Sequence, residues 1–120
     1  MRITKKMRSE IKQKFGGKCA YCGVKLGDKW HADHVKTVLR GKNGMERPEN
    51  HNMDNIFPSC VSCNLHKGGW DLDDWRENIE RAAEICSSQT MFKTAMRVGK
   101  LLVSSEPVVF YFERVKDGDL

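Results

Sequence analysis

Residues 19–22 read Cys-Ala-Tyr-Cys, and residues 60–67 read Cys-Val-Ser-Cys-Asn-Leu-His-Lys. Each cysteine pair has two residues between its sulfurs, a spacing that lets one short turn chelate a metal ion. The pairs are separated by 37 residues, and four such thiolates can converge on one tetrahedral Zn²⁺. We therefore predict a structural zinc site that closes a long loop and is held by Cys19, Cys22, Cys60 and Cys63.

Polar side chains suited to phosphodiester chemistry lie on and beside this loop. Asp33 can give an anionic oxygen to a divalent ion and Asn64 a neutral amide oxygen, a donor set that suits Mg²⁺ or Mn²⁺. His34, with an ordinary pKa near ~6.5, can act as a general base. Because adjacent strand residues point to opposite faces, we expect Asp33 and His34 where a strand ends or bends. Asn55 is placed to brace the backbone near His34.

The chain has 120 residues with 39% hydrophobic and 31% charged content, which is typical of a single globular domain. Its net charge of +5 is uneven, since residues 1–67 hold 14 Lys/Arg and 6 Asp/Glu, whereas residues 68–120 hold 7 and 10. The basic half is expected to attract polyanions, although a merely solvated surface would give the same pattern. The candidate contacts to a DNA backbone are Lys36, Arg40, Lys42 and Lys67.

The N-terminal segment does not resemble a signal peptide or a membrane anchor. Residues 1–18 carry seven Lys/Arg, one Glu and no apolar run. No part of the sequence approaches the ~20 consecutive apolar residues that a membrane helix requires. Five cysteines without a secretory signal favour a reducing compartment, so we expect a cytoplasmic (intracellular) protein whose paired cysteines bind metal.

The periodicity of apolar residues predicts an α+β fold. One helix face carries Met7, Ile11 and Phe15, and a longer amphipathic helix begins at Leu72 and includes Cys86 in its core. The predicted segments are helices over 9–15, 60–67, 72–86 and 91–102, strands over 30–35, 55–58 and 107–115, and a loop over 40–52. We expect a core over residues 1–68 and a helical and strand extension over residues 69–120, packed as one compact domain.

In combination, Cys19-x-x-Cys22, Asp33-His34, Asn55 and Cys60-x-x-Cys63-Asn64-x-x-Lys67 resemble an HNH endonuclease over about residues 18–68. The resemblance implies a zinc-stapled, treble-clef-like ββα-metal core that hydrolyses DNA to 5′-phosphate and 3′-hydroxyl ends. It implies His34 as general base, Asn55 as a structural residue, Asp33 and Asn64 as ligands of the catalytic Mg²⁺ or Mn²⁺, and the four cysteines as ligands of a separate Zn²⁺.

Two positions depart from the commoner family pattern. Thr37 stands three residues after the base in place of Pro, and Asn64 stands in place of His, so the chain is similar to the His-Asn-Asn variant of homing and phage nucleases. His66 is the alternative ligand if Asn64 points away. A non-catalytic zinc-dependent DNA-binding module and a protein-interaction module remain alternatives, and the extension could bind a protein partner or form a homodimer.

Overall fold

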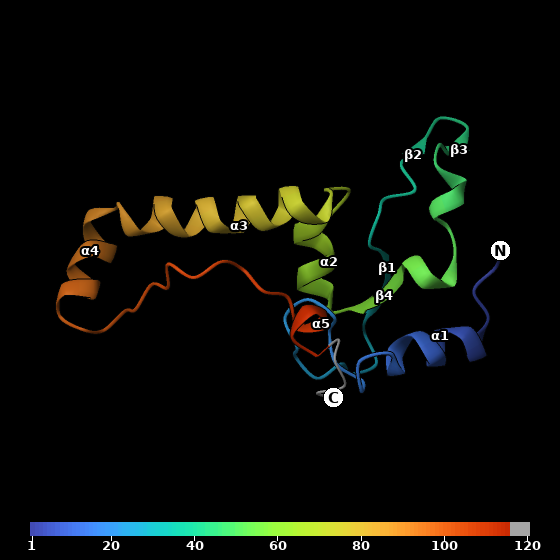
Figure 1. Cartoon of the computed structure of the whole chain (residues 1–120), viewed down its shortest axis with the longest axis horizontal. Coiled ribbons are helices and arrows are strands. Elements are labelled where there is room, and N and C mark those ends of the chain that lie inside the picture. Colours follow the sequence, from blue (N-terminus) through green and yellow to red (C-terminus); the bar gives the residue numbers. More distant parts are fainter. Residues whose placement is uncertain (116–120) are drawn as a thin grey trace. The chain divides into compact units, whose positions relative to one another are not determined.

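A computed structural model of the chain describes residues 1–115 (Figure 1). Their contacts divide the described residues into two units, one formed by Met1–Leu72 with residues 109–115 and the other by Asp73–Val108. The elements are α1 (Lys5–Gln13), β1 (His31–His34), β2 (Arg40–Gly41), β3 (Gly44–Met45), the 3₁₀ turns η1 (Pro48–Asn50) and η2 (Met53–Asn55), β4 (Ile56–Ser59), α2 (Val61–Lys67), α3 (Leu72–Ser87), α4 (Thr90–Arg97) and α5 (Tyr111–Arg114).

The centre of the first unit is a two-stranded antiparallel sheet followed by a helix. β1 pairs with β4, with Asp33 opposite Phe57 and His34 opposite Ile56. α2 begins directly after β4 and packs against β1, and Figure 1 shows these elements together. This β1–β4–α2 arrangement confirms the predicted α+β class and the ββα core.

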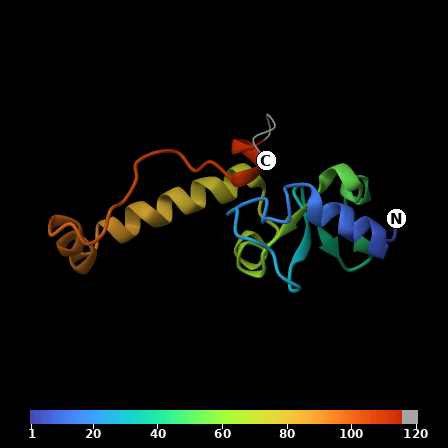
Figure 2. The ribbon, with the colours of Figure 1, turned by 90° about the horizontal axis from the view of Figure 1, so that it is seen from below.

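Helix α1 covers the sheet, and its basic side chains serve the fold. The Thr4 hydroxyl caps its first turn, and α1 packs against β1 and β4, as Figure 2 illustrates. Arg8 donates to the Trp30 carbonyl at 2.8 Å and lies 3.9 Å from the Trp30 ring centroid. Lys14 donates to the Ile56 carbonyl at 2.8 Å. Part of the positive charge of the N-terminal half therefore holds α1 on the sheet.

An aromatic cluster joins the sheet to the segment that contains α5. The Phe57 ring centroid lies 5.0 Å from that of Phe15 and 5.0 Å from that of Phe112. The Tyr21 ring lies 5.7 Å from Phe110 in an edge-to-face arrangement, a favourable geometry for aromatic pairs. These contacts place the C-terminal part of the described chain against the first cysteine pair.

The prediction of a strand over 107–115 is wrong. The backbone amides of Tyr111 and Phe112 donate to the carbonyls of Tyr21 and Ala20, at 3.0 and 2.7 Å, and the chain then turns into α5. The Glu113 carboxylate accepts the Phe110 amide at 2.9 Å and stabilises this turn. The alternation of apolar side chains reflects insertion of Phe110 and Phe112 into the aromatic cluster.

Other predicted segments are correct in type but not in extent. Helix α1 begins four residues earlier than predicted, and α4 ends at Arg97, well before residue 102. The segment 40–52, predicted as a loop, contains the short hairpin β2–β3 and the turn η1. Cys86 is exposed on α3, so its predicted place in the helix core is wrong.

The second unit consists of α3, α4 and a segment that returns beside α3 (Figures 1 and 2). Arg76 donates to the Val108 carbonyl at 2.6 Å, and the Val108 amide donates to the Glu80 carboxylate at 2.8 Å. Residues 1–115 contain no helix with the length and apolar character needed to cross a membrane.

Candidate functional site

The four paired cysteines form one cluster, as predicted. Their sulfur atoms all lie within 4.8 Å of one another, and the Sγ atoms of Cys22 and Cys60 are 3.8 Å apart. Four sulfurs at ~2.3 Å from a tetrahedral zinc would be separated by about 3.8 Å. The cluster therefore has the donors and spacing of a zinc site, made by the turn at 19–22 and the N-terminus of α2.

Local hydrogen bonds prepare the sulfurs for a metal. The backbone amides of Tyr21 and Cys63 point at the sulfurs of Cys19 and Cys60, each at 3.4 Å, and Cys60 is the N-cap of α2. The hydrogen bond from the Cys63 thiol is the main cause that lowers the pKa of Cys19 to about 4, whereas the same contact raises the pKa of Cys63. The sulfurs are thus close enough to share a proton, and a metal ion that binds them takes them as thiolates.

The Asp33 carboxylate is buried and contacts three side chains. Its Oδ2 accepts the Tyr21 hydroxyl at 2.5 Å and lies 3.1 Å from the Lys67 ammonium. Its Oδ1 accepts a hydrogen bond from the Asn64 amide nitrogen at 3.2 Å. Burial and the Asp33 charge raise the pKa of Tyr21, so this hydroxyl remains a donor. Both carboxylate oxygens are therefore held by the protein, Oδ2 by Tyr21 and Lys67 and Oδ1 by Asn64.

Lys67 is a buried partner of the site. Its side chain is fully buried, and its ammonium bridges Asp33 and the His34 carbonyl, the latter at 2.9 Å. This burial contradicts the predicted contact between Lys67 and a DNA phosphate, because the ammonium is already committed inside the fold.

His34 contacts a second histidine. Its Nε2 lies 2.8 Å from Nδ1 of His51, and Nε2 of His51 lies 2.7 Å from the Met1 carbonyl oxygen. Burial, followed by the nearby His51 and Arg40 charges, lowers the pKa of His34 below its ordinary value. The imidazole is therefore neutral over a wider pH range than a free histidine.

Asn55 binds backbone on both sides of this histidine pair. Its side chain accepts the Lys36 amide at 3.0 Å and donates to the carbonyls of Lys36 and Asn50 at 2.8 and 2.7 Å. Lys36 lies two residues after His34, and Asn50 immediately precedes His51. Asn55 therefore contacts the backbone next to His34, the predicted base, and does not contact the His34 ring.

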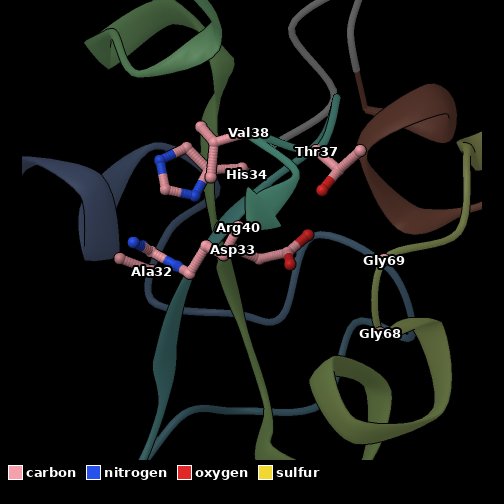
Figure 3. Close-up of a pocket in the computed structure, with 8 residues that line it drawn as sticks. All are labelled: Ala32, Asp33, His34, Thr37, Val38, Arg40, Gly68 and Gly69. Carbon is pink, nitrogen blue, oxygen red and sulfur yellow. The ribbon is translucent and has the colours of Figure 1, made fainter. Parts of the chain in front are cut away.

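Asp33 and His34 border one cavity of about 320 Å³ (Figure 3). His34 is the last residue of β1, where the strand geometry allows both neighbours to reach one site, although their side chains point in different directions in Figure 3. Arg40 also borders the cavity, whereas Lys36 and Lys42 are exposed elsewhere on the same segment. The cavity is lined by Ala32, Asp33, His34, Thr37, Val38, Arg40, Gly68 and Gly69.

The fold thus brings Asp33 and Asn64 into contact, whereas the alternative ligand His66 is exposed. The sequence interpretation missed Tyr21 and His51 as neighbours of Asp33 and His34. Tyr21 lies between Cys19 and Cys22, and this position next to the cluster could have indicated that its side chain lies near the site. His51 lies in a polar segment and gave no comparable signal.

Comparison with known proteins agrees with this geometry. Residues 19–69 match the family model described as HNH endonuclease. A curated relative, the "SPbeta prophage-derived putative HNH endonuclease YoqL" of Bacillus subtilis (strain 168), is 26% identical over 76 residues, which cover 61% of this chain. The chain spans about a third of that relative's length, 33%. No solved structure matches the chain. These findings support a nuclease-type function for the domain.

Proposed function

We propose that this protein is a metal-dependent endonuclease that hydrolyses DNA phosphodiester bonds. The observation that carries the proposal is the placement of Asp33 and His34 on one cavity, with Asn64 in contact with Asp33, inside the HNH-family segment. Arg40 adds a cationic side chain to the same cavity.

In this proposal His34 is the general base. A phosphodiester is attacked by water only slowly, and a neutral imidazole assists by accepting the proton that the water loses. The lowered pKa of His34 keeps the ring in that neutral form. Lys67 binds the His34 carbonyl and Asn55 binds the backbone two residues later, so the segment that carries the base is held at both points.

Asp33 and Asn64 are the residues proposed to hold the catalytic Mg²⁺ or Mn²⁺. Asp33 Oδ1 is the carboxylate oxygen that faces Asn64, and rotation of the Asn64 amide would present its oxygen on the same side. Two oxygen donors with water completing the shell suit a hard cation. Such an ion, when bound, supplies positive charge that stabilises the developing charge on the phosphate and leaving oxygen.

The four-cysteine cluster is proposed to hold structural Zn²⁺, because its sulfur spacing fits that ion. Lys36, Arg40 and Lys42 are proposed to contact the DNA backbone, since all three are exposed on the segment that follows His34. A nuclease core over residues 1–68 and an extension over 69–120 that binds a protein partner or a second copy both remain proposals.

One observation favours a second function, a zinc-dependent DNA-binding module without catalysis. The Lys67 ammonium lies 3.1 Å from Asp33 and already neutralises the carboxylate that would attract a divalent ion. We nevertheless favour the nuclease, because Lys67 occupies Oδ2, whereas Oδ1 contacts only the neutral Asn64 amide, which can rotate to present its oxygen.

A cleavage assay on supercoiled plasmid DNA distinguishes the two functions. Wild-type protein should nick or linearise it with Mg²⁺ or Mn²⁺ and not with EDTA. His34→Ala should cut at least ~10²-fold more slowly with unchanged zinc content. His31→Ala is the matched control, because His31 is an exposed histidine of the same strand. Salt-sensitive DNA binding without cutting would support the binding module, and equal cutting by His34→Ala would exclude the assigned base.

A further inference from the structure

The contact between His34 and His51 constrains the protons of both rings. The centroids are 5.1 Å apart and the rings are inclined by 52°, so the nitrogens meet edge to edge and the rings do not stack. The two nitrogen contacts, 2.8 Å between the rings and 2.7 Å from His51 to the Met1 carbonyl, both lie within hydrogen-bond distance.

A carbonyl oxygen can only accept a hydrogen bond, so Nε2 of His51 must carry a proton. In a neutral imidazole the other nitrogen then carries a lone pair, and Nδ1 of His51 is an acceptor. His34 must consequently donate from its Nε2. Its Nδ1 is the nitrogen left with a lone pair, and it is the atom able to take a proton.

The backbone around the pair is held by one amide. Asn55 bonds to Lys36 on the His34 side and to Asn50 on the His51 side. The His51 amide also donates to the Pro48 carbonyl at 3.0 Å, which closes the turn η1. The backbone on the His34 side and the backbone on the His51 side are therefore both held by hydrogen bonds, and these bonds keep the two rings in contact.

We infer that His51 is a positioning residue for His34. His51 accepts the hydrogen bond from His34 Nε2, fixes the orientation of the His34 ring, and selects the tautomer whose Nδ1 can act as base. The inference rests on the proposed function for its catalytic consequence, because a ring with its proton on Nδ1 has no lone pair there to accept another. The tautomer itself is a property of the folded protein and can be measured whether or not the protein cuts DNA.

The first experiment is ¹⁵N NMR of the histidine rings in the full zinc-loaded chain, at a pH above the titration of both rings. Wild-type His34 should have a protonated Nε2 and an unprotonated Nδ1. His51→Ala should lose this preference, and His51→Asn should retain it, because the Asn oxygen can replace Nδ1 as acceptor. A wild-type His34 protonated on Nδ1 would overturn the inference, even if no variant folds.

The second experiment is cleavage kinetics of the same proteins. His51→Ala should lower kcat by at least about 10-fold with little change in KM, since misplacing a base weakens the chemical step and not binding. His51→Asn should recover most of kcat, and His31→Ala should match wild type. Normal kcat for His51→Ala would overturn the positioning role. A wild-type protein that does not cut would refute the proposed function, and the ring tautomer would still decide the inference.

Discussion

Replacing Lys67 with Met should destabilise the protein strongly, because it leaves the buried Asp33 carboxylate without its cation. The ammonium is fully buried and 3.1 Å from Oδ2. At an effective dielectric constant of about 20, the attraction at that distance is on the order of 5 kcal/mol, and desolvation of the pair offsets part of it. Removing one partner of a buried pair typically costs about 3–5 kcal/mol, and the orphaned His34 carbonyl contributes to that cost.

Urea unfolding of the zinc-loaded protein, followed by circular dichroism, measures this loss as a shift of the midpoint at constant slope. The matched control is Arg81→Met, which breaks the pair between Arg81 and Glu77 at 3.7 Å, where both side chains are about two-thirds exposed, 67% and 70%. That exposed pair should contribute at most about 0.5 kcal/mol. The contrast isolates burial, because both variants remove one positive charge.

A double-mutant cycle decides whether the pair itself is responsible. Combining Lys67→Met with Asp33→Asn removes both charges, so the double variant should be more stable than the sum of the single losses predicts, by about 2 kcal/mol. A Lys67→Met loss below about 1 kcal/mol, or strictly additive single losses, would refute the assignment of Lys67 as the buried counter-ion of Asp33.

Four further predictions follow from the site and its support. Chelating the zinc should abolish the cooperative fold of the first unit, since such sites contribute on the order of 10 kcal/mol or more, and unchanged circular dichroism would contradict this. Because the pKa of His34 is lowered, activity in a cleavage assay run across a pH range should fall on the acid side only below the ordinary histidine pKa of ~6.5, with its midpoint at the lowered pKa. A midpoint above ~6.5 would contradict the assignment of this acid limb to His34. Arg40→Ala should weaken DNA binding and reduce the salt slope of log K by about 0.9, which a salt titration measures. Gly23→Ala should destabilise by about 1–3 kcal/mol, because φ is +79° and a Cβ would lie 2.8 Å from the Tyr111 ring, whereas Gly27→Ala, in open space, should be near neutral in thermal unfolding.

The four-cysteine cluster and the ββα core could be predicted because their signals are local. A Cys-x-x-Cys turn has the same geometry wherever it occurs, and the second pair lies where α2 begins. Asp33 and Asn64 were predicted to meet because each has a fixed offset from a strand end or a cysteine pair. The positions of these residues relative to one another depend little on how the rest of the chain folds.

The partners of the site could not be predicted, because they depend on how distant segments pack. The sequence places Lys67 one turn past Asn64 on α2, and it was therefore interpreted as a phosphate ligand. The sequence does not show whether that face of α2 packs against β1 or is exposed to solvent. His51 reaches His34 only through the path of residues 35–55, which has no strong periodicity. The alternating segment 107–115 was read as a strand, whereas its phenylalanines are alternately spaced because they enter an aromatic cluster.

The most direct measurement is Mn²⁺ titration of the zinc-loaded protein followed by electron paramagnetic resonance, with His34 ring signals recorded in parallel by NMR. Wild-type protein should bind one Mn²⁺ that broadens the His34 signals, and Asp33→Asn and Asn64→Ala should each weaken binding at unchanged zinc content. No Mn²⁺ binding, or equal binding by both variants, would contradict a catalytic ion held by Asp33 and Asn64 beside His34.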